Sequence, residues 1–237
     1  MSRLEHPAPF EARWRGSWIW HRRPRIDLPT ASRPEAAEPV DAVSLLRRRI
    51  DLNVVPADAP ARIWVDGRYR LCVNGVEVAR GPVRSDPRRA HYDVVDLAEQ
   101  LVVGENVIAI TARHYGAPTS WWTPVTPSYS LGVGSVAFEA LVGDEWIVSD
   151  RSWRSAPGSA WTPVELPGDV ASLPLEDFDA AAHPHGWELA GFDDEAWRSA
   201  VEISPMHTGG GARVEPPSEP FGMLRPPVRV AFPGGDR

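Results

Sequence analysis

The stretch 113–122 carries the densest set of side chains that could bind a sugar. It reads Arg-His-Tyr-Gly-Ala-Pro-Thr-Ser-Trp-Trp, with rings at His114, Tyr115, Trp121 and Trp122. Aromatic faces stack on the C–H faces of sugar rings, while flanking polar groups hydrogen-bond to hydroxyls. These four residues are therefore carbohydrate-binding candidates. The simpler alternative is that both tryptophans pack beneath the loop or against a neighbouring domain.

A second candidate lies in the polar loop Arg84-Ser85-Asp86-Pro87-Arg88-Arg89, directly after the Gly81-Pro82 turn. Arg84 is able to form a planar, bidentate contact with a ligand or with Asp86. We include Arg84 and Asp86 among the carbohydrate-binding candidates. A solvated loop with no ligand is the simpler interpretation of the same residues.

Motifs of the common hydrolases and nucleotide-binding enzymes are missing from the sequence, including the serine elbow, the zinc-protease helix and the phosphate loop. A glycosidase needs two carboxylates facing each other across a cleft. The pair Asp193-Asp194 is better explained as a cap of a short turn and its exposed neighbour. His183 and His185 have no acidic cluster at metal-ligand spacing. The sequence therefore predicts no catalytic residue, no metal site and no cofactor.

Composition narrows the class of protein. The chain has 237 residues and a formal net charge of −7, which argues against a nucleic-acid binder. No apolar run approaches the ~20 residues that span a bilayer, and the N-terminus lacks the apolar region of a signal peptide. We therefore expect a cytoplasmic protein without a membrane or nucleic-acid partner. One cysteine, Cys72, excludes an internal disulfide, and its place in a strand pattern makes it either a small buried hydrophobe or an inert surface residue.

We expect the elements that position these residues to be short strands. Apolar and polar residues alternate from about residue 43, as in half-buried strands. Asn74-Gly75 predicts a tight hairpin, because both residues accept the positive φ of a type I′ turn. The continuous apolar run 107–112 predicts a central strand. At least seven such strands, separated by turn signals and without a long helix, predict an all-β fold, an antiparallel β-sandwich or jelly roll.

One short helical turn is expected between two of these strands. Asp96 with Glu99 three residues later has the pattern of a capping box. Leu97 and Leu101 would then point at the core, and Gly104 would take the left-handed position that ends the turn. Along the whole chain we expect a loose leader over residues 1–13, a sandwich domain over 14–204 with an irregular segment at 149–191, and a closing strand and linker over 205–237.

Several motifs resemble, in order and spacing, the N-terminal β-sandwich of bacterial α-L-rhamnosidases. They are Trp18-Ile19-Trp20, Asp66 through Gly75, Arg80 through Arg84, Tyr92 through Leu97, Leu101 through Ala109, Phe178-Asp179-Ala180, Gly186-Trp187, Gly191 through Trp197 and Leu224 through Arg229. The resemblance covers roughly residues 14–230. In one place the chain departs from it: Phe-Asp-Ala-Ala at 178–181 replaces the usual Tyr-Asp-Ala-Arg, so the role of that arginine cannot be carried over.

The resemblance implies a galactose-binding-like jelly roll placed ahead of a helical toroid that hydrolyses terminal α-L-rhamnosides with inversion. It places the catalytic acids in the toroid, so no catalytic residue is assigned to this chain. The resulting hypothesis is a non-catalytic accessory module whose partners are a rhamnoside-like carbohydrate and a C-terminal helical catalytic domain. An independent, lectin-like carbohydrate-binding module is the alternative. A third hypothesis is that this piece is itself an enzyme, which an activity assay would test.

Overall fold

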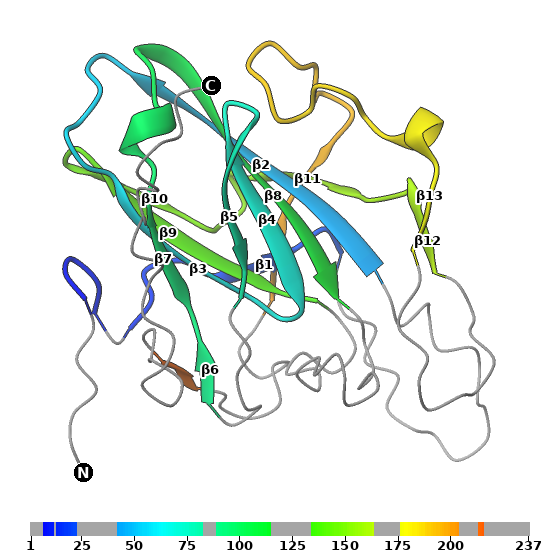
Figure 1. Ribbon diagram of the computed structural model, residues 1–237, viewed down its shortest axis with the longest axis horizontal. Coiled ribbons are helices and arrows are strands. Elements are labelled where there is room, and N and C mark those ends of the chain that lie inside the picture. Colours follow the sequence, from blue (N-terminus) through cyan, green and yellow to red (C-terminus); the bar gives the residue numbers. More distant parts are fainter. Residues whose placement is uncertain are drawn as a thin grey trace, which may run out of the picture.

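The computed structural model describes residues 7–11, 13–22, 42–82, 89–114, 134–163, 176–203 and 213–215. In this part of the chain nearly every regular element is a strand, and two sheets of six strands each lie face to face (Figure 1). The pairing within both sheets is antiparallel. The predicted antiparallel β-sandwich is confirmed.

The strands of the two sheets interleave along the chain. The first sheet has the order β15-β1-β9-β3-β7, with β10 paired to β9. Its strands are β1 (Trp18–Trp20), β3 (Pro60–Val65), β7 (Asp93–Asp96), β9 (Val136–Val142), β10 (Glu145–Val148) and β15 (Val201–Ile203). The second sheet has the order β14-β11-β2-β8-β4-β5. Its strands are β2 (Ala42–Leu52), β4 (Arg68–Val73), β5 (Val76–Gly81), β8 (Gly104–His114), β11 (Arg154–Pro157) and β14 (Arg198–Ser199).

Smaller elements complete the described fold. Two pairs of short strands lie outside the main sheets, β12 (Trp161–Pro163) with β13 (Glu176–Phe178), and β6 (Arg89–His91) with β16 (Arg213–Glu215). The two helical turns are η1 (Ala98–Gln100) and η2 (Ala180–Ala182). Among the described residues, no helix is both long enough and apolar enough to span a lipid bilayer.

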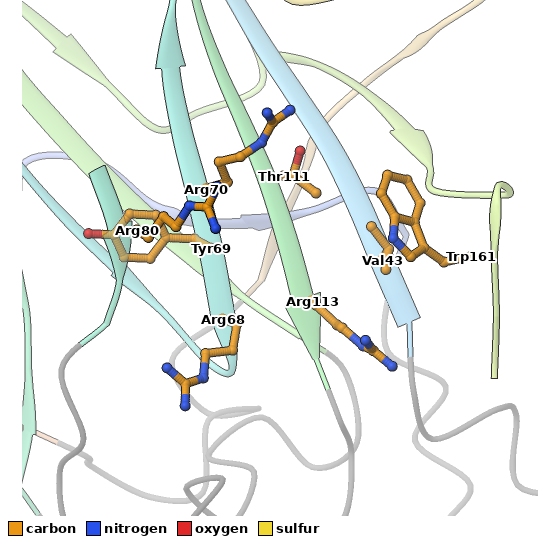
Figure 2. A pocket seen from close by; sticks show the side chains of 8 residues that line it. All are labelled: Val43, Arg68, Tyr69, Arg70, Arg80, Thr111, Arg113 and Trp161. Carbon is orange, nitrogen blue, oxygen red and sulfur yellow. The ribbon is translucent and has the colours of Figure 1, made fainter. Parts of the chain in front are cut away.

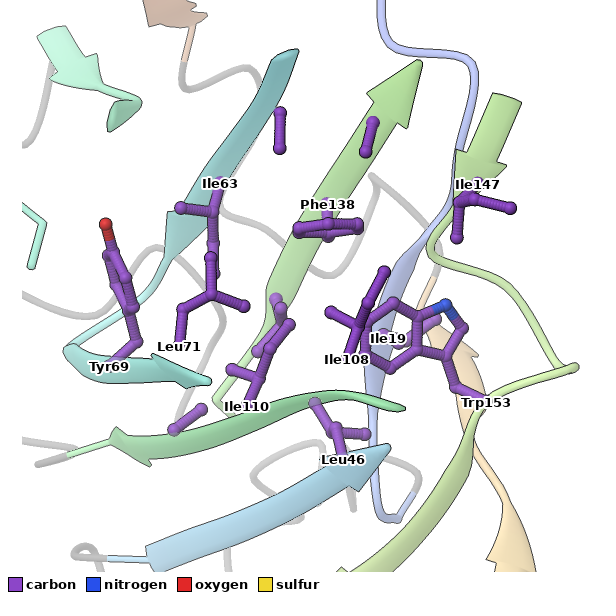
Figure 3. Packing of buried hydrophobic residues seen from close by; sticks show 14 of the residues in the cluster. Ile19, Leu46, Ile63, Tyr69, Leu71, Ile108, Ile110, Phe138, Ile147 and Trp153 are labelled. Carbon is purple, nitrogen blue, oxygen red and sulfur yellow. The ribbon is translucent and has the colours of Figure 1, made fainter. Parts of the chain in front are cut away.

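The main core fills the space between the two sheets, as Figure 3 shows. Tyr69, Leu71 and Val73 alternate along β4 and all three are buried there, as their spacing predicts. The first sheet contributes Phe138, whose ring packs edge-to-face on Trp153 at a centroid distance of 5.4 Å. Residues between these positions on β4 point to the outer face of the second sheet.

The predicted hairpin and helical turn are both present. Asn74 has φ 52° and Gly75 has φ 79°, and they join β4 to β5. Leu97 and Leu101 are buried on either side of η1. The predicted capping box is not formed, because the N-cap of η1 is Leu97, which makes no side-chain cap hydrogen bond. The Asp96 carboxylate instead accepts a hydrogen bond of 2.9 Å from the Ala98 N–H. These features are local in sequence, which is why they could be predicted.

Within the segment expected to be irregular, residues 149–191, the described residues 149–163 and 176–191 are more ordered than predicted. It contains β11, which pairs with β2 in the second sheet, as well as β12, β13 and η2. A short strand such as β11 has too few residues to show the alternation of apolar and polar side chains. Of the predicted closing strand and linker at 205–237, only β16 falls within the described residues.

The described part of the predicted leader is packed rather than loose. Phe10 is only 5% exposed, and it lies edge-to-face against Tyr92 and Trp146 on the outer face of the first sheet. The buried Arg62 guanidinium donates to the carbonyl oxygen of Glu11 at 2.7 Å. Residues 7–11 therefore pack on the first sheet, because their partners come from strands far along the chain.

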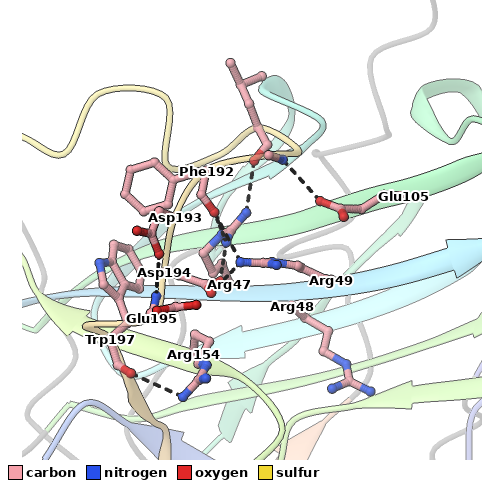
Figure 4. Close-up of polar contacts among 12 residues, drawn as sticks. Arg47, Arg48, Arg49, Glu105, Arg154, Phe192, Asp193, Asp194, Glu195 and Trp197 are labelled. Atoms are coloured by element: carbon pink, nitrogen blue, oxygen red, sulfur yellow. Dashed lines mark hydrogen bonds and ion pairs between the residues drawn. The ribbon is translucent and has the colours of Figure 1, made fainter.

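The acid pair at 193–194 also differs from expectation. Asp193 accepts a hydrogen bond of 3.0 Å from the Glu195 N–H, so its capping role is confirmed. Its neighbour Asp194 is buried instead of exposed, and its carboxylate contacts the guanidinium groups of Arg47 and Arg49 on β2 (Figure 4). This contact fastens the segment 188–197 to the outer face of the second sheet.

Candidate functional site

A hollow lies on the outer face of the second sheet, beside the segment that Asp194 fastens. Its volume is about 290 Å³. The residues that line it are Val43, Arg68, Tyr69, Arg70, Arg80, Thr111, Arg113 and Trp161. Figure 2 shows these side chains over β2, β4 and β8, with the Trp161 ring next to β2. We call this hollow the arginine pocket, because four of its eight lining residues are arginines.

The register of the strands explains why these residues meet. One row across the sheet places Arg113 of β8 between Val43 of β2 and Arg68 of β4. All three point to the outer face, because they alternate with residues that point into the core. The turn before β4 is made possible by Gly67, whose φ is +131° and where an added Cβ would lie 2.0 Å from the Arg113 carbonyl oxygen.

The next row across the same sheet adds two more arginines. Thr111 of β8 lies opposite Arg70 of β4, and Arg70 lies opposite Arg80 of β5. The sheet therefore sets arginine directly against arginine in two places, Arg68 with Arg113 and Arg70 with Arg80. Like charges in directly opposed positions destabilise a sheet unless an anion is close.

Two carboxylates at the border of the pocket lie against Arg70 and Arg80. Glu188, in the turn after η2, contacts the Arg70 guanidinium. Glu77, at the exposed end of β5, accepts a hydrogen bond of 2.8 Å from the Nη2 of Arg80. Hydrogen bonds from Arg80 lower the pKa of the Glu77 carboxyl group, so this carboxylate stays ionised beside the cation. Neither glutamate lines the pocket itself.

An aromatic group forms the other side of the arginine pocket. The Trp161 ring lies 4.9 Å from the Phe178 ring and 5.4 Å from the His183 imidazole, measured between centroids. Burial lowers the pKa of His183, and the charges of His185 and Arg70 lower it further. The imidazole is therefore neutral near pH 7, and this side of the pocket is an uncharged aromatic surface.

The thiol of Cys72 lies on the same face of β4 as Arg68 and Arg70, but it is covered. Cys72 is buried with Trp187 and Val107 in a small second core. Burial, with a smaller contribution from the Glu188 carboxylate, raises the pKa of the thiol to about 12. Of the two interpretations of Cys72, the structure therefore shows the buried hydrophobe, and the thiol is unreactive.

Most of the predicted sugar-binding residues lie outside the part of the chain that the structure describes. Tyr115, Trp121, Trp122, Arg84 and Asp86 lie outside the described residues, so their role stays a prediction.

His114, the one described residue of that set, is 2% exposed. Its Nδ1 lies 3.1 Å from the carbonyl oxygen of Asp66, an arrangement that fixes the ring in place. By alternation His114 lies on the opposite face of β8 from Arg113, so it is not part of the arginine pocket.

The residues that do line a pocket were not predicted from the sequence. The only signal for them was the alternation in Arg68-Tyr69-Arg70-Leu71, which puts two arginines on one face of a strand. Trp161 had no signal, because it reaches the pocket from a separate short strand. Within the described residues, no three histidine, cysteine or acidic side chains lie close enough together to hold a metal ion.

Comparisons with known proteins agree with the fold. A sequence model of the family described as "Alpha-L-rhamnosidase N-terminal domain" matches residues 56–223. An α-L-rhamnosidase from Streptomyces avermitilis is 25% identical over 217 residues, which is 90% of this chain and 17% of that protein. The crystal structure of a GH78 family rhamnosidase of Bacillus sp. GL1 superposes with a TM-score of 0.64 and 26% identity, over 86% of this chain and 20% of that one.

A lectin from Pleurotus ostreatus shares the fold, with a TM-score of 0.53 at 20% identity over 91% of this chain and 48% of the lectin. This chain thus spans about a fifth of the length of the rhamnosidases that it matches. Because the family model matches well over half of its residues, the chain belongs to the α-L-rhamnosidase N-terminal domain family.

Proposed function

We propose that this chain is a non-catalytic accessory module of an α-L-rhamnosidase, which supports a catalytic domain located elsewhere in the protein. The observation that carries the proposal is the chemistry of the arginine pocket. Its lining consists of arginine, threonine, tyrosine, valine and tryptophan, with no carboxylate among the described lining residues. Hydrolysis of a glycoside needs an acid and a base or nucleophile, supplied by two carboxylates on either side of the bond.

The covered outer faces also favour a supporting role. The segment 7–17 packs on the first sheet through Phe10 and the buried Arg62, and the segment 188–197 packs on the second sheet through Asp194. The chain's own residues therefore cover part of the outer face of each sheet. Such a module can fold as a unit and present its loops to a neighbouring domain.

A direct assay tests the non-catalytic role. The purified 237-residue chain is incubated with p-nitrophenyl α-L-rhamnoside, beside a complete α-L-rhamnosidase as positive control. We expect no release of p-nitrophenol by the chain alone. Release that grows in proportion to the chain's concentration, and that survives repeated purification, would overturn the proposal.

The second candidate function is an independent carbohydrate-binding module, and the observation that favours it is Trp161 at the edge of a pocket with polar groups. Calorimetric titration of the whole chain with L-rhamnose and an aryl rhamnoside separates the two. Binding that is lost in Trp161→Ala, Trp121→Ala or Trp122→Ala would support the binding module and locate its site. The supporting role predicts weak binding or none in all four proteins.

A further inference from the structure

We propose that Asn74 is a latent deamidation site, which the fold closes and unfolding opens. Asn74 and Gly75 form the turn between β4 and β5. The modification converts the asparagine side chain into a carboxylate that the folded hairpin does not accommodate. The inference goes beyond the proposed function and does not depend on it, because it concerns the chemical fate of a turn and not a contact with carbohydrate or with a catalytic domain.

The sequence singles out Asn74 for this chemistry. The chain contains three asparagines, Asn53, Asn74 and Asn106, and only Asn74 is followed by glycine. Glycine has no Cβ, so its backbone nitrogen can approach the preceding side chain without steric hindrance. The residues that follow Asn53 and Asn106 are valines, whose branched side chains hinder the same approach. In the unfolded chain Asn74 is therefore the reactive asparagine.

The reaction consumes only water. The Gly75 backbone nitrogen, after losing its proton to the solvent, attacks the Cγ of Asn74 and closes a succinimide ring. The bond between Cγ and the amide nitrogen breaks, and this nitrogen leaves as ammonia. Water then opens the ring at either of its carbonyl groups and gives aspartate or isoaspartate. The net change is from an amide and water to a carboxylic acid and ammonia, so no oxidant, reductant or cofactor takes part.

The fold holds the Asn74 amide in a way that opposes this reaction. Its Nδ2 donates to the Gln100 carbonyl oxygen and to the Asn106 Oδ1, both at 2.8 Å. Its Oδ1 accepts a hydrogen bond of 2.9 Å from the Val107 N–H. Attack at Cγ makes the planar amide tetrahedral and detaches Nδ2, so the reaction must break these hydrogen bonds. The site is therefore closed as long as the hairpin stays attached to the start of β8.

The Asn106 side chain makes this arrangement rigid. Asn106 is fully buried, and its Oδ1 also accepts a hydrogen bond of 2.8 Å from the Val102 N–H. Its Nδ2 donates to the carbonyl oxygens of Val102 and Gly104, at 2.7 and 2.8 Å. Both amide hydrogens of Asn74 and both of Asn106 thus have an acceptor. A buried polar network in which every donor is used favours a single arrangement.

The products of deamidation do not fit this network. An aspartate at position 74 has no hydrogen to donate, and its carboxylate would face two oxygens, the Gln100 carbonyl and the Asn106 Oδ1. An isoaspartate lengthens the main chain inside the turn that sets Val73 opposite Val76. Chains that are modified while unfolded therefore refold to a less stable state, and the modification makes the unfolding event irreversible.

The first experiment compares the folded with the unfolded chain. The purified chain is kept in mildly alkaline buffer with and without guanidinium chloride, and its peptides are analysed by mass spectrometry for deamidation and isoaspartate. A synthetic peptide of residues 70–79 in both buffers corrects for the effect of the denaturant. We expect Asn74 to react at least about tenfold more slowly in the folded chain, because reaction requires local opening of the hairpin. Equal corrected rates in the two states would overturn the inference.

Asn53 provides the internal control for exposure. It is exposed in the folded chain and followed by valine, so we expect little modification of Asn53 in either state. Modification of Asn53 as fast as that of Asn74 in the unfolded chain would overturn the assignment of the site to the Asn-Gly pair.

Asn106→Ala tests whether the network protects the site. This variant removes one acceptor of the Asn74 amide, so the folded variant should be modified at least about threefold faster than the parent, the ratio that loss of one hydrogen bond produces. Asn53→Ala is the matched control and should react at Asn74 as the parent does. An Asn106→Ala chain that is folded and reacts no faster than the parent would overturn the protective role.

Asn74→Asp tests the consequence without the reaction, and it keeps the inference testable if Asn106→Ala does not fold. We expect Asn74→Asp to unfold at a lower guanidinium chloride concentration than the parent, whereas Asn53→Asp, which adds the same charge at an exposed residue, should unfold as the parent does. Equal midpoints for the two aspartate variants would overturn the inference. None of these outcomes bears on rhamnoside hydrolysis, so failure of the inference leaves the proposed function intact.

Discussion

Arg47 on β2 is fully buried, and its guanidinium contacts the carboxylate of Asp194, which lies 147 residues further along the chain. The same guanidinium donates to the Leu189 carbonyl oxygen at 2.9 Å. One buried cation thus holds both ends of the segment that covers the second sheet and borders the arginine pocket (Figure 4). Loss of this ion pair is therefore expected both to destabilise the fold and to displace the segment that borders the arginine pocket.

Removal of the Asp194 carboxylate should destabilise the whole chain. Asp194→Ala leaves the buried Arg47 without its partner, and loss of one member of a buried ion pair costs about 3–5 kcal/mol. Urea unfolding, followed by tryptophan fluorescence, measures this loss. Asp193→Ala is the matched control, since Asp193 is an exposed cap whose removal costs about 1 kcal/mol. Equal losses in the two variants would contradict a structural role of the Arg47–Asp194 pair.

The packing of the N-terminal segment on the first sheet can be tested by the same unfolding measurement. Phe10→Ala should lower the free energy of unfolding by about 3 kcal/mol, because a buried ring is deleted from its contacts with Tyr92 and Trp146. Phe178→Ala provides a control of the same chemistry at a position that is 44% exposed. If both substitutions have the same small effect, residues 7–13 do not pack on the first sheet.

Burial of His21 predicts a pH dependence of stability. Burial, with a smaller contribution from Arg22, lowers the pKa of His21 from 6.5 to about 4. Between these values the unfolded chain binds a proton on His21 that the folded chain does not, so stability falls as the pH drops through this window, by about 3 kcal/mol in all. Stability is fully present above pH 6.5 and the His21 contribution is lost as the pH falls through about 4.

Urea unfolding at several pH values between these limits measures the effect. His21→Gln should flatten the dependence across the window, whereas His185→Gln, at an exposed imidazole, should leave it unchanged. A His21→Gln chain that loses stability with falling pH as steeply as the parent would show that other groups are responsible.

The Cys72 thiol provides a probe of the covered face. Because its pKa is raised to about 12, almost no thiolate is present in the folded chain near pH 8. We expect no reaction with Ellman's reagent in the native state, and one thiol per chain after denaturation in guanidinium chloride. Rapid reaction of the native chain would mean that the segment carrying Trp187 does not cover the second sheet.

The features that could be predicted from the sequence are those whose causes lie within a few residues. Asn74-Gly75 predicted its hairpin because the backbone of these two residues accepts a positive φ, and the alternation of Tyr69, Leu71 and Val73 predicted their shared buried face. The structure adds that the Asn74 amide donates to Asn106 Oδ1 at 2.8 Å, which ties the hairpin to the start of β8. The fold class followed from many such local signals.

The arginine pocket could not be predicted in this way. Arg68 meets Arg113 only because β4 pairs with β8 in one register, and Trp161 joins them from a strand outside the sheet. Asp194 was expected to be exposed because its partner, Arg47, lies in a distant strand. The candidates chosen from the sequence were instead a run of neighbouring aromatic residues, since adjacency is visible in a sequence and strand register is not.

The central claim is that this chain is a non-catalytic accessory module that supports a catalytic domain. Incubation of the purified chain with p-nitrophenyl α-L-rhamnoside, beside a complete α-L-rhamnosidase, tests this claim most directly. We expect no release of p-nitrophenol above the buffer blank from the chain alone. Release that rises in proportion to the concentration of the chain would contradict the claim.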